Sequence, residues 1–263
     1  MFVDSHCHLD CIDLSDFDDN FENLIQHSID AGIEHMLCVS INLQKYPGML
    51  DKVRAYPNIS VSAGMHPMAD ESDVFTVDYL SALAKDEKVV AIGETGLDYY
   101  YHKGDTQWQL QRFRSHVQVA NEVGKPVIIH TRDAGDDTLM VLREENAEKC
   151  GGVIHCFTET QEFAERAMEL GFMISISGIV TFRNADSLRA IAKTIPDDRL
   201  LIETDSPYLA PVPYRGKQNQ PAYVNKVAET LAEIRATDIE HIAEITRENY
   251  YRLFGHAEAA MTC

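Results

Sequence analysis

Eight short apolar runs, each followed by a stretch with helical spacing, constrain the fold of this chain more than any other feature. The runs are rich in Val, Ile and Leu, are too short for helices and are bounded by Gly, Pro, Asn or Asp, which favours strands. They cover residues 1–4, 35–40, 59–63, 89–93, 126–130, 152–157, 172–177 and 199–203. Apolar side chains at helical spacing predict helices that include residues 105–123, 138–147, 162–170, 187–193, 224–234 and 239–254.

The alternation of strand and helix predicts a parallel sheet. Eight such units in 263 residues match a single-domain α/β fold, the (β/α)8 TIM barrel, which takes about 250 residues. A doubly wound open sheet is the structural alternative. No linker, low-complexity tract or block of charge marks a domain boundary. We therefore expect one barrel domain over residues 1–255 and a short polar tail at residues 256–263.

Composition narrows the class of protein further. A content of 45% hydrophobic and 25% charged residues is typical of a folded globular chain and excludes disordered, collagen-like and coiled-coil proteins. The net charge of −19 argues against a protein that coats duplex DNA through a broad basic surface. It does not exclude a nucleic-acid substrate, because bound divalent cations supply positive charge where it is needed.

The sequence shows neither the pattern of a signal peptide or membrane helix nor a CxxC pair of cysteines. The first residues do not have the basic and apolar regions of a signal peptide, and no apolar run approaches the ~20 residues of a membrane helix. The six cysteines include no CxxC pair. We therefore expect reduced thiols, a cytoplasmic location, no membrane contact and no obligate protein partner.

Polar side chains at the ends of the apolar runs point to the chemistry. In a barrel the carboxyl ends of the strands converge on one face, where the active site lies. The first run leads into His6-Cys7-His8, and strand alternation points both imidazoles to the same side. Histidine or a carboxylate occupies the equivalent place in several other units. The candidate metal ligands are His6, His8, Glu94, His130, His155 and Asp205.

Four imidazoles and two carboxylates exceed the needs of one tetrahedral site and favour two divalent ions. His6, His8 and Asp205 would hold one ion, because the first and last strands adjoin when a barrel closes. The histidines of the adjacent fifth and sixth runs would hold the other. Glu94 is the best bridge, since a carboxylate can join ions about 3.5–4 Å apart. The mixed nitrogen and oxygen donors suit Zn, Mn or Fe, whereas Mg prefers an all-oxygen shell.

Seven segments resemble the TatD family of metal-dependent deoxyribonucleases. They are VDSHCHLD, GMHP, GETGLDYYY, KPVIIHTRDA, GVIHCFTE, SISGIVTFRNA and LIETDSPYLAP, and they run from residue 3 to residue 211. The resemblance implies a TIM barrel with a binuclear divalent metal site and hydrolase activity, often on DNA. It implies one ion on His6, His8, Glu94 and Asp205 and a second on Glu94, His130 and His155.

The resemblance also implies a mechanism, the hydrolysis of a phosphodiester by water that two divalent cations (Mg, Mn or Zn) acidify. Asp205 would accept the proton of that water, and Glu94 would serve both ions. GETGLD contains no lysine, the residue that bridges the metals as a carbamate in many amidohydrolase-like relatives, and this favours the nuclease branch over the amidase and phosphotriesterase branches.

Further polar residues near the strand ends are candidates for substrate contact. Arg132 and Arg183 follow the fifth and seventh runs and are suited to bind phosphate, although isolated arginines are more often surface residues. His66 is a candidate for contact with substrate, or is a turn residue fixed by Pro67. Glu203 is a candidate that orients a ligand or a water, or is the partner in an ion pair that faces a helix. The tyrosines at 99–101, 208 and 214 either stack on exposed bases or pack within loops, and Lys103, Arg215 and Lys217 are weaker candidates.

Three functions remain open at this stage. The first is a deoxyribonuclease that prefers single-stranded DNA or strand ends, because an acidic chain with rim tyrosines suits unpaired bases better than a long duplex. The second is a hydrolase of another ester or amide, of the lactonase or amidohydrolase type. The third is a non-catalytic binding barrel, which has no need of six metal-ligating groups.

Overall fold

The computed structural model describes residues 1–255 and contains eight strands and nine α-helices within that range. The strands are β1 Phe2–Cys7, β2 Ile33–Cys38, β3 Ile59–Ala63, β4 Val89–Asp98, β5 Val127–Arg132, β6 Gly152–Ile154, β7 Met173–Ile176 and β8 Leu200–Ile202. The helices are α1 Phe21–Asp30, α2 Tyr46–Val53, α3 Val77–Leu83, α4 Gln107–Val123, α5 Gly135–Glu144, α6 Gln161–Glu169, α7 Asp186–Ala192, α8 Val224–Arg235 and α9 Ile239–Phe254.

All eight strands belong to one sheet and follow one another in chain order. The neighbouring pairs β1–β2, β3–β4, β4–β5, β5–β6 and β6–β7 are parallel. A parallel bridge joins Cys7 at the end of β1 to Ser206 after β8, so the first and last strands adjoin. A parallel sheet that meets itself in this way is a (β/α)8 barrel, which confirms the predicted fold class and excludes the open sheet. The domain limits of 1–255 stay a prediction, and the tail at residues 256–263 lies outside the described residues.

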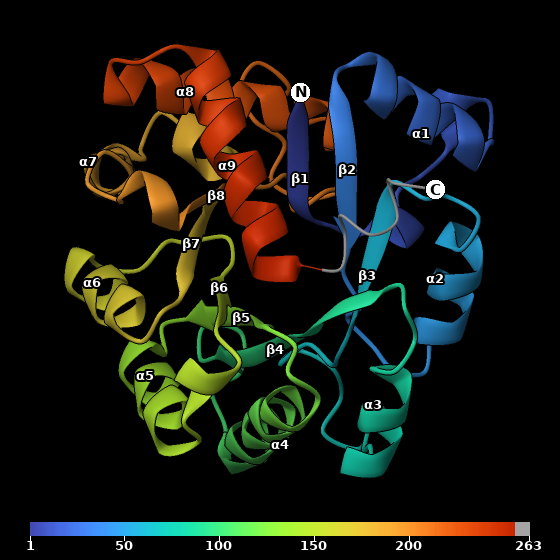
Figure 1. Cartoon of the computed structure of the whole chain (residues 1–263), viewed down its shortest axis with the longest axis vertical. Helices are drawn as coiled ribbons and strands as arrows, with labels where there is room; N and C mark the ends of the chain where they lie inside the picture. The colour runs from blue at the N-terminus through green and yellow to red at the C-terminus, as the bar shows by residue number, and fades with distance from the viewer. Residues whose placement is uncertain (256–263) are drawn as a thin grey trace. The chain divides into compact units, whose positions relative to one another are not determined.

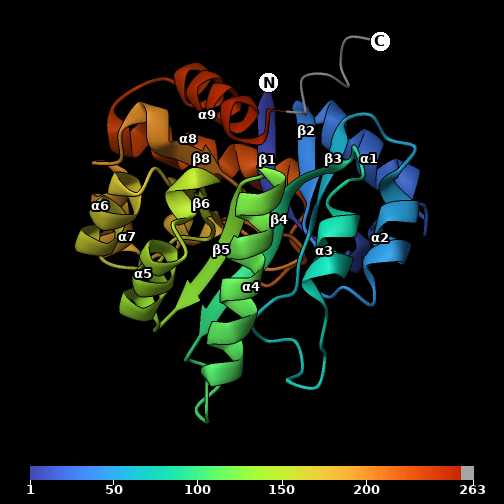
Figure 2. The same cartoon turned by 60° about the horizontal axis from the view of Figure 1, so that its bottom comes forward.

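Residue contacts divide the chain into two compact units. The first consists of Met1–Cys38 and Ser175–Arg252, and Val39–Ile174 forms the main part of the second. In the first unit, α9 lies beside the amino-terminal end of β1, where Arg247 donates a hydrogen bond to Glu34 of β2 (Figure 2). In the second unit, helices α3 to α6 lie along the outer side of strands β4 to β6 (Figure 1).

Helix α4 shows how the second unit builds its core. Its side chains at Phe113, His116, Val117 and Ala120 follow the i, i+3, i+4, i+7 spacing and are fully buried. The helix ends at Gly124, which has the left-handed conformation (φ 66°) that glycine adopts without strain. The predicted helix over residues 105–123 therefore corresponds closely to the observed one.

Three strands extend further than the apolar runs indicate. β1 continues to Cys7, β5 to Arg132 and β4 to Asp98, so that Glu94 lies within β4 rather than after it. Polar residues interrupt the apolar pattern in all three strands, and glycines interrupt it in β4 as well. A Cβ atom on Gly96 would lie 2.0 Å from the carbonyl oxygen of His130, so only glycine lets β4 pair closely with β5 at this point.

No helix within residues 1–255 is long and apolar enough to cross a membrane. The five described cysteines form no disulfide.

Candidate metal centre

Three side chains of the first unit bring their donor atoms together at the ends of β1 and β8. The Nε2 atoms of His6 and His8 lie 3.3 Å apart, and they lie 3.6 and 3.3 Å from Oδ1 of Asp205. Both histidines are buried, and the Asp205 side chain is 13% exposed. The sequence predicted this grouping from the His-x-His pattern and the closure of the barrel.

Backbone hydrogen bonds fix the two strands that carry this cluster. The amide of Asp205 donates to the carbonyl of His6 (2.9 Å), and the amide of His8 donates to the carbonyl of Ser206 (2.7 Å). The buried carboxyl of Asp4 accepts from the amide and the hydroxyl of Thr204 (2.9 and 2.5 Å). Burial raises the pKa of Asp4 to about 8, and the hydrogen bonds from Thr204 offset only part of this rise.

Glu94 is the centre of a second cluster, in the second unit. Its Oε1 atom lies 2.7 Å from Nε2 of His155, 3.1 Å from Nδ1 of His130 and 3.3 Å from Nε2 of His66. The carboxylate is 2% exposed. One buried oxygen therefore faces three imidazole nitrogens.

His130 is oriented by a second carboxylate. Its Nδ1 faces Glu94, and its Nε2 lies 3.1 Å from Oδ2 of Asp98. Burial lowers the pKa of an imidazole, but the hydrogen bonds to Asp98 and Glu94 outweigh it and raise the pKa of His130. For Asp98, burial raises the pKa, and the hydrogen bond with His130 reverses this to a net lowering. Histidine that binds a metal through one nitrogen commonly donates its other N–H to a carboxylate in this way.

Helix α4 holds the loop that carries His66. The guanidinium of Arg112, 8% exposed, donates to the carbonyls of Ala69, Asp70 and Asp73 (3.2, 2.8 and 2.9 Å). One turn further along α4, His116 accepts a hydrogen bond at Nε2 from the amide of Met65 (3.1 Å). These contacts fix the loop on both sides of His66, whose Nδ1 accepts from the amide of Met68 (3.0 Å). Its Nε2 is thereby directed toward Glu94.

The donor separations provide a test of whether metal ions fit these residues. Ligand atoms about 2.1 Å from an ion at the centre of a tetrahedron lie about 3.4 Å from one another. The three separations in the first cluster are 3.3, 3.3 and 3.6 Å. In the second cluster Glu94 lies 3.1 Å from His130 and 2.7 Å from His155, and the nearest nitrogens of these two histidines lie 3.5 Å apart. Two of these separations are close to the tetrahedral value, and the 2.7 Å separation is shorter, as in a direct hydrogen bond. The imidazole and carboxylate donors also suit Zn or Mn, so the residues present fit divalent metal ions.

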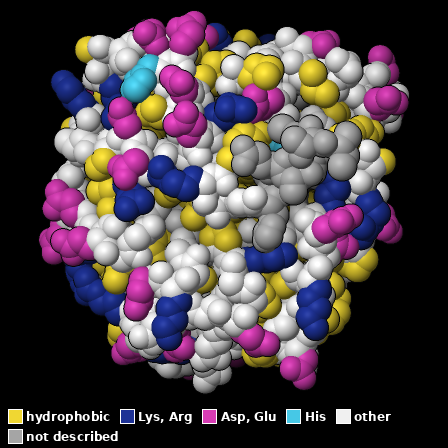
Figure 3. All heavy atoms as spheres, viewed as in Figure 1, with side chains coloured by type: hydrophobic (Ala, Val, Ile, Leu, Met, Phe, Trp, Pro, Cys, Tyr) yellow, Lys and Arg dark blue, Asp and Glu magenta, His cyan; other side chains and the backbone are white. Residues whose placement is uncertain are grey.

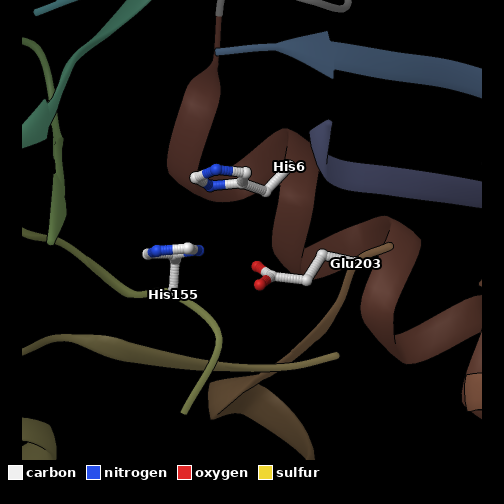
Figure 4. Close-up of side chains that lie close together, drawn as sticks. All are labelled: His6, His155 and Glu203. Atoms are coloured by element: carbon white, nitrogen blue, oxygen red, sulfur yellow. The ribbon is translucent and has the colours of Figure 1, made fainter. Parts of the chain in front are cut away.

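The structure also places the four predicted substrate-contact residues. His66 belongs to the Glu94 cluster. Glu203 follows β8, and its carboxylate projects to the same side as the imidazole of His6, with donor atoms within 4.8 Å of each other (Figure 4). Arg132 ends β5, two residues beyond His130. Arg183 is exposed, in the segment before α7.

The sequence analysis did not identify two residues that position members of the Glu94 cluster. Asp98 stands four residues after Glu94, and the period of two along a strand was the available signal that both share one side of β4. Arg112 left no comparable signal, because its partners are backbone carbonyls 39 to 43 residues away along the chain.

A family model described as TatD related DNase matches residues 3–255. The chain belongs to the TatD family. A relative from Escherichia coli K12, the uncharacterized metal-dependent hydrolase YcfH, is 48% identical over 258 residues, which cover 98% of this chain and 97% of that protein. The 3'-5' ssDNA/RNA exonuclease TatD of Salmonella typhimurium is 32% identical over 246 residues, covering 91% of this chain and 95% of that protein.

A solved structure supports the same assignment. The TatD homologue YJJV from Escherichia coli superimposes with a TM-score of 0.87 at 28% sequence identity, over 97% of this chain and 98% of that one. The agreement extends over nearly the whole of both chains, which is consistent with the barrel described above. The chain is therefore a metal-dependent hydrolase of the TatD family with a TIM-barrel fold.

Proposed function

We propose that this TatD-family chain is a deoxyribonuclease that hydrolyses phosphodiester bonds and prefers single-stranded DNA or strand ends. The observation that carries the proposal is the pair of buried histidine and carboxylate clusters, whose donor atoms lie 2.7 to 3.6 Å from one another. Imidazole and carboxylate donors gathered at such separations suit divalent ions. The relative from Salmonella typhimurium, whose alignment covers 91% of this chain, is named a 3'-5' ssDNA/RNA exonuclease, and this name supports the choice of substrate class.

In this proposal each cluster holds one ion. His6, His8 and Asp205 hold the first, and Glu94, His130 and His155 hold the second. The double role of Glu94 as a ligand of both ions stays a prediction. Divalent ions bound at such sites acidify water and stabilise the negative charge that develops on phosphate oxygens.

The remaining roles belong to side chains of the chain itself. Asp205 accepts the proton of the attacking water, because its carboxylate is the most exposed group of its cluster. The backbone amide of Asp205 donates a hydrogen bond to the carbonyl of His6, which fixes the backbone that carries this carboxylate. Arg132 and Arg183 bind phosphate oxygens of the substrate. Glu203 orients water or substrate beside His6, and His66 does so beside Glu94.

The acidic net charge of the chain favours short or unpaired stretches of DNA over a long duplex. On the one face drawn in Figure 3, where α9 lies, Lys and Arg side chains stand among Asp and Glu side chains and form no continuous basic area. The net charge is −19. Duplex binding through many phosphates requires a broad basic surface, whereas a metal site with a few nearby arginines is sufficient for a single strand.

The test is a panel of substrates with the purified chain in saturating Mn or Zn. Labelled single-stranded DNA, blunt duplex, RNA, amides and lactones are compared over time. We expect the fastest release of nucleotides from single-stranded DNA, and a loss of about 10²- to 10⁴-fold in kcat for Asp205→Asn. Turnover of a lactone or amide without nucleotide release from any oligonucleotide would overturn the proposal in favour of the second hydrolase class.

Two arginine variants make the panel sharper. Arg132→Ala is expected to raise KM or lower kcat for oligonucleotides while the metal content stays unchanged, because arginine contacts phosphate and not metal. Arg54→Ala is the matched control, since its guanidinium pairs with Asp86 away from either cluster (2.8 Å). Equal effects of both substitutions would remove Arg132 from the substrate site.

A further inference from the structure

Three consecutive tyrosines follow β4, and the structure separates their roles. The Tyr99 hydroxyl donates a hydrogen bond to Oδ2 of Asp137 (2.7 Å), so this ring is packed against α5. Tyr100 and Tyr101 are 49% and 60% exposed. Their two rings meet edge to face, with centroids 4.9 Å apart and planes at 90°.

Arg132 occupies the corner between the two exposed rings. Its Cζ atom lies 4.1 Å from the ring centroid of Tyr100 and 4.8 Å from that of Tyr101. Both distances lie within the ~6 Å range of a cation–π contact. A guanidinium whose flat face rests on an aromatic ring keeps its N–H edge directed outward, and that edge matches the oxygens of a phosphate.

The turn that carries the tyrosines is rigidly held. The amides of Tyr100 and Tyr101 both donate to Oδ1 of Asp98 (3.0 and 2.8 Å). The Lys103 ammonium donates to the carbonyl of Tyr99 (2.6 Å) and lies 5.6 Å from the ring centroid of Tyr100. A ligand that binds here therefore meets rings and charges that are already in position, which lowers the entropic cost of binding.

This group lies beside the second metal cluster. Strand alternation puts Arg132 on the same side of β5 as His130 and about 6.6 Å further along the strand. The same Asp98 carboxylate whose Oδ1 caps the tyrosine turn faces Nε2 of His130 with its Oδ2 (3.1 Å). The tyrosines and the arginine therefore lie next to the proposed site of hydrolysis.

We propose that Tyr100, Tyr101 and Arg132 form a binding platform for one nucleotide of a single-stranded nucleic acid. The N–H edge of Arg132 binds a phosphate oxygen, and the exposed ring of Tyr101 stacks on the base of the same strand. Tyr100 lies beneath the guanidinium and fixes its plane. The platform rests on the proposed function, because it assigns the nucleotide next to the bond that is cleaved.

The chemistry of the platform favours an unpaired base. An exposed aromatic ring binds the flat face of a base, and in a duplex both faces are already covered by neighbouring pairs. Arg132 and Lys103 supply local positive charge on a chain of net charge −19, which matches a single phosphate better than a long row of them. A neutral amide or lactone would use neither feature.

The experiment measures binding separately from cleavage. The metal-loaded protein is added to a labelled probe, and binding is followed by fluorescence anisotropy. One probe is a single-stranded phosphorothioate oligonucleotide, and the other is an abasic oligonucleotide of the same length and backbone. We expect wild-type protein to prefer the base-bearing probe by about ten-fold, as base stacking on an aromatic side chain predicts. Tyr101→Ala is expected to lose this preference, whereas Tyr101→Phe retains the ring and the preference.

Two controls connect each residue to its part of the ligand. Tyr79→Ala removes another exposed tyrosine, 43% exposed on α3, and is expected to bind like wild type. Arg132→Lys is expected to weaken both probes equally, because it retains the charge but loses the planar guanidinium. An unchanged preference for the base-bearing probe in Tyr101→Ala would overturn the platform.

Failure of the platform and failure of the proposed function are distinguishable in these measurements. Cleavage of single-stranded DNA at the same kcat/KM by wild type and Tyr101→Ala would retain the nuclease and refute the platform. Binding that depends on Tyr101 without cleavage by any metal-loaded sample would retain the platform and refute the nuclease.

Discussion

Asp98 is expected to control metal binding at the second cluster although it is not one of the proposed ligands. Its Oδ2 faces His130 Nε2 at 3.1 Å, and its Oδ1 accepts from the amides of Tyr100 and Tyr101. The substitution Asp98→Asn keeps the shape of the side chain and an acceptor for the two amides. It removes the negative charge that holds His130, whereas Asp98→Ala removes all three contacts.

The magnitude follows from the one contact that the asparagine loses. A hydrogen bond to a charged group contributes about 1.5–3 kcal/mol. That free energy corresponds to a roughly 10- to 100-fold loss of metal affinity, which is also the usual effect of removing a carboxylate behind a metal-binding histidine. Asp98→Ala is expected to weaken oligonucleotide binding as well, because the turn that carries the tyrosines loses its cap.

Competition with a chromophoric chelator for Zn or Mn measures both affinities in one titration. We expect Asp98→Asn to weaken one ion and to leave the ion at His6 and His8 at its wild-type affinity. Asp137→Asn is the control, since Asp137 contacts the Tyr99 hydroxyl and not a metal-binding histidine. Wild-type affinity for both ions in Asp98→Asn would refute the idea that this carboxylate supports His130.

Two further predictions concern metal content and pH. Elemental analysis in saturating Mn or Zn should give two ions per chain, and about one for the double variant His6→Ala/His8→Ala; a wild-type value of one or less would contradict the two-ion proposal. Burial lowers the pKa of His116 from 6.5 to about 4, so its contribution to stability is complete above pH ~6.5 and falls by about 3 kcal/mol between pH 6.5 and pH 4. Urea unfolding at both pH values should show this loss in wild type and a smaller one in His116→Gln; equal losses in the two proteins would contradict it.

The alternation of apolar runs and helical spacing was sufficient to predict the barrel, because each strand of a parallel sheet is buried on both sides and reads as an apolar run. It did not locate the first three helices. Helix α2 begins with Tyr46-Pro47-Gly48, and helix α3 has only seven residues, so neither presents a long periodic pattern. The prediction ended strand β4 at residue 93, five residues before its observed end, because Glu94 and Gly96 interrupt its apolar sequence.

The candidate site was predictable wherever strand geometry fixes side-chain direction. His6 in β1 and His8 directly after it both lie close to Asp205, as the His-x-His pattern predicted. The place of His66 was not predictable, because contacts with α4 set the direction of its loop. The pairing of Arg132 with the tyrosines is likewise a product of the parallel register between β4 and β5, which no local pattern encodes.

The carboxylate of Asp98 has one oxygen on the imidazole of His130 and the other on the backbone of the tyrosine turn. A group shared in this way makes the two occupancies thermodynamically dependent on each other. An ion that orders His130 also orders Asp98, and with it the turn to which a nucleotide would bind. Linkage then requires that the nucleotide increase the affinity for the ion by the same factor by which the ion increases the affinity for the nucleotide. Substrate would thereby help to retain the metal during turnover, and the released product would leave a chain that exchanges its ion more readily.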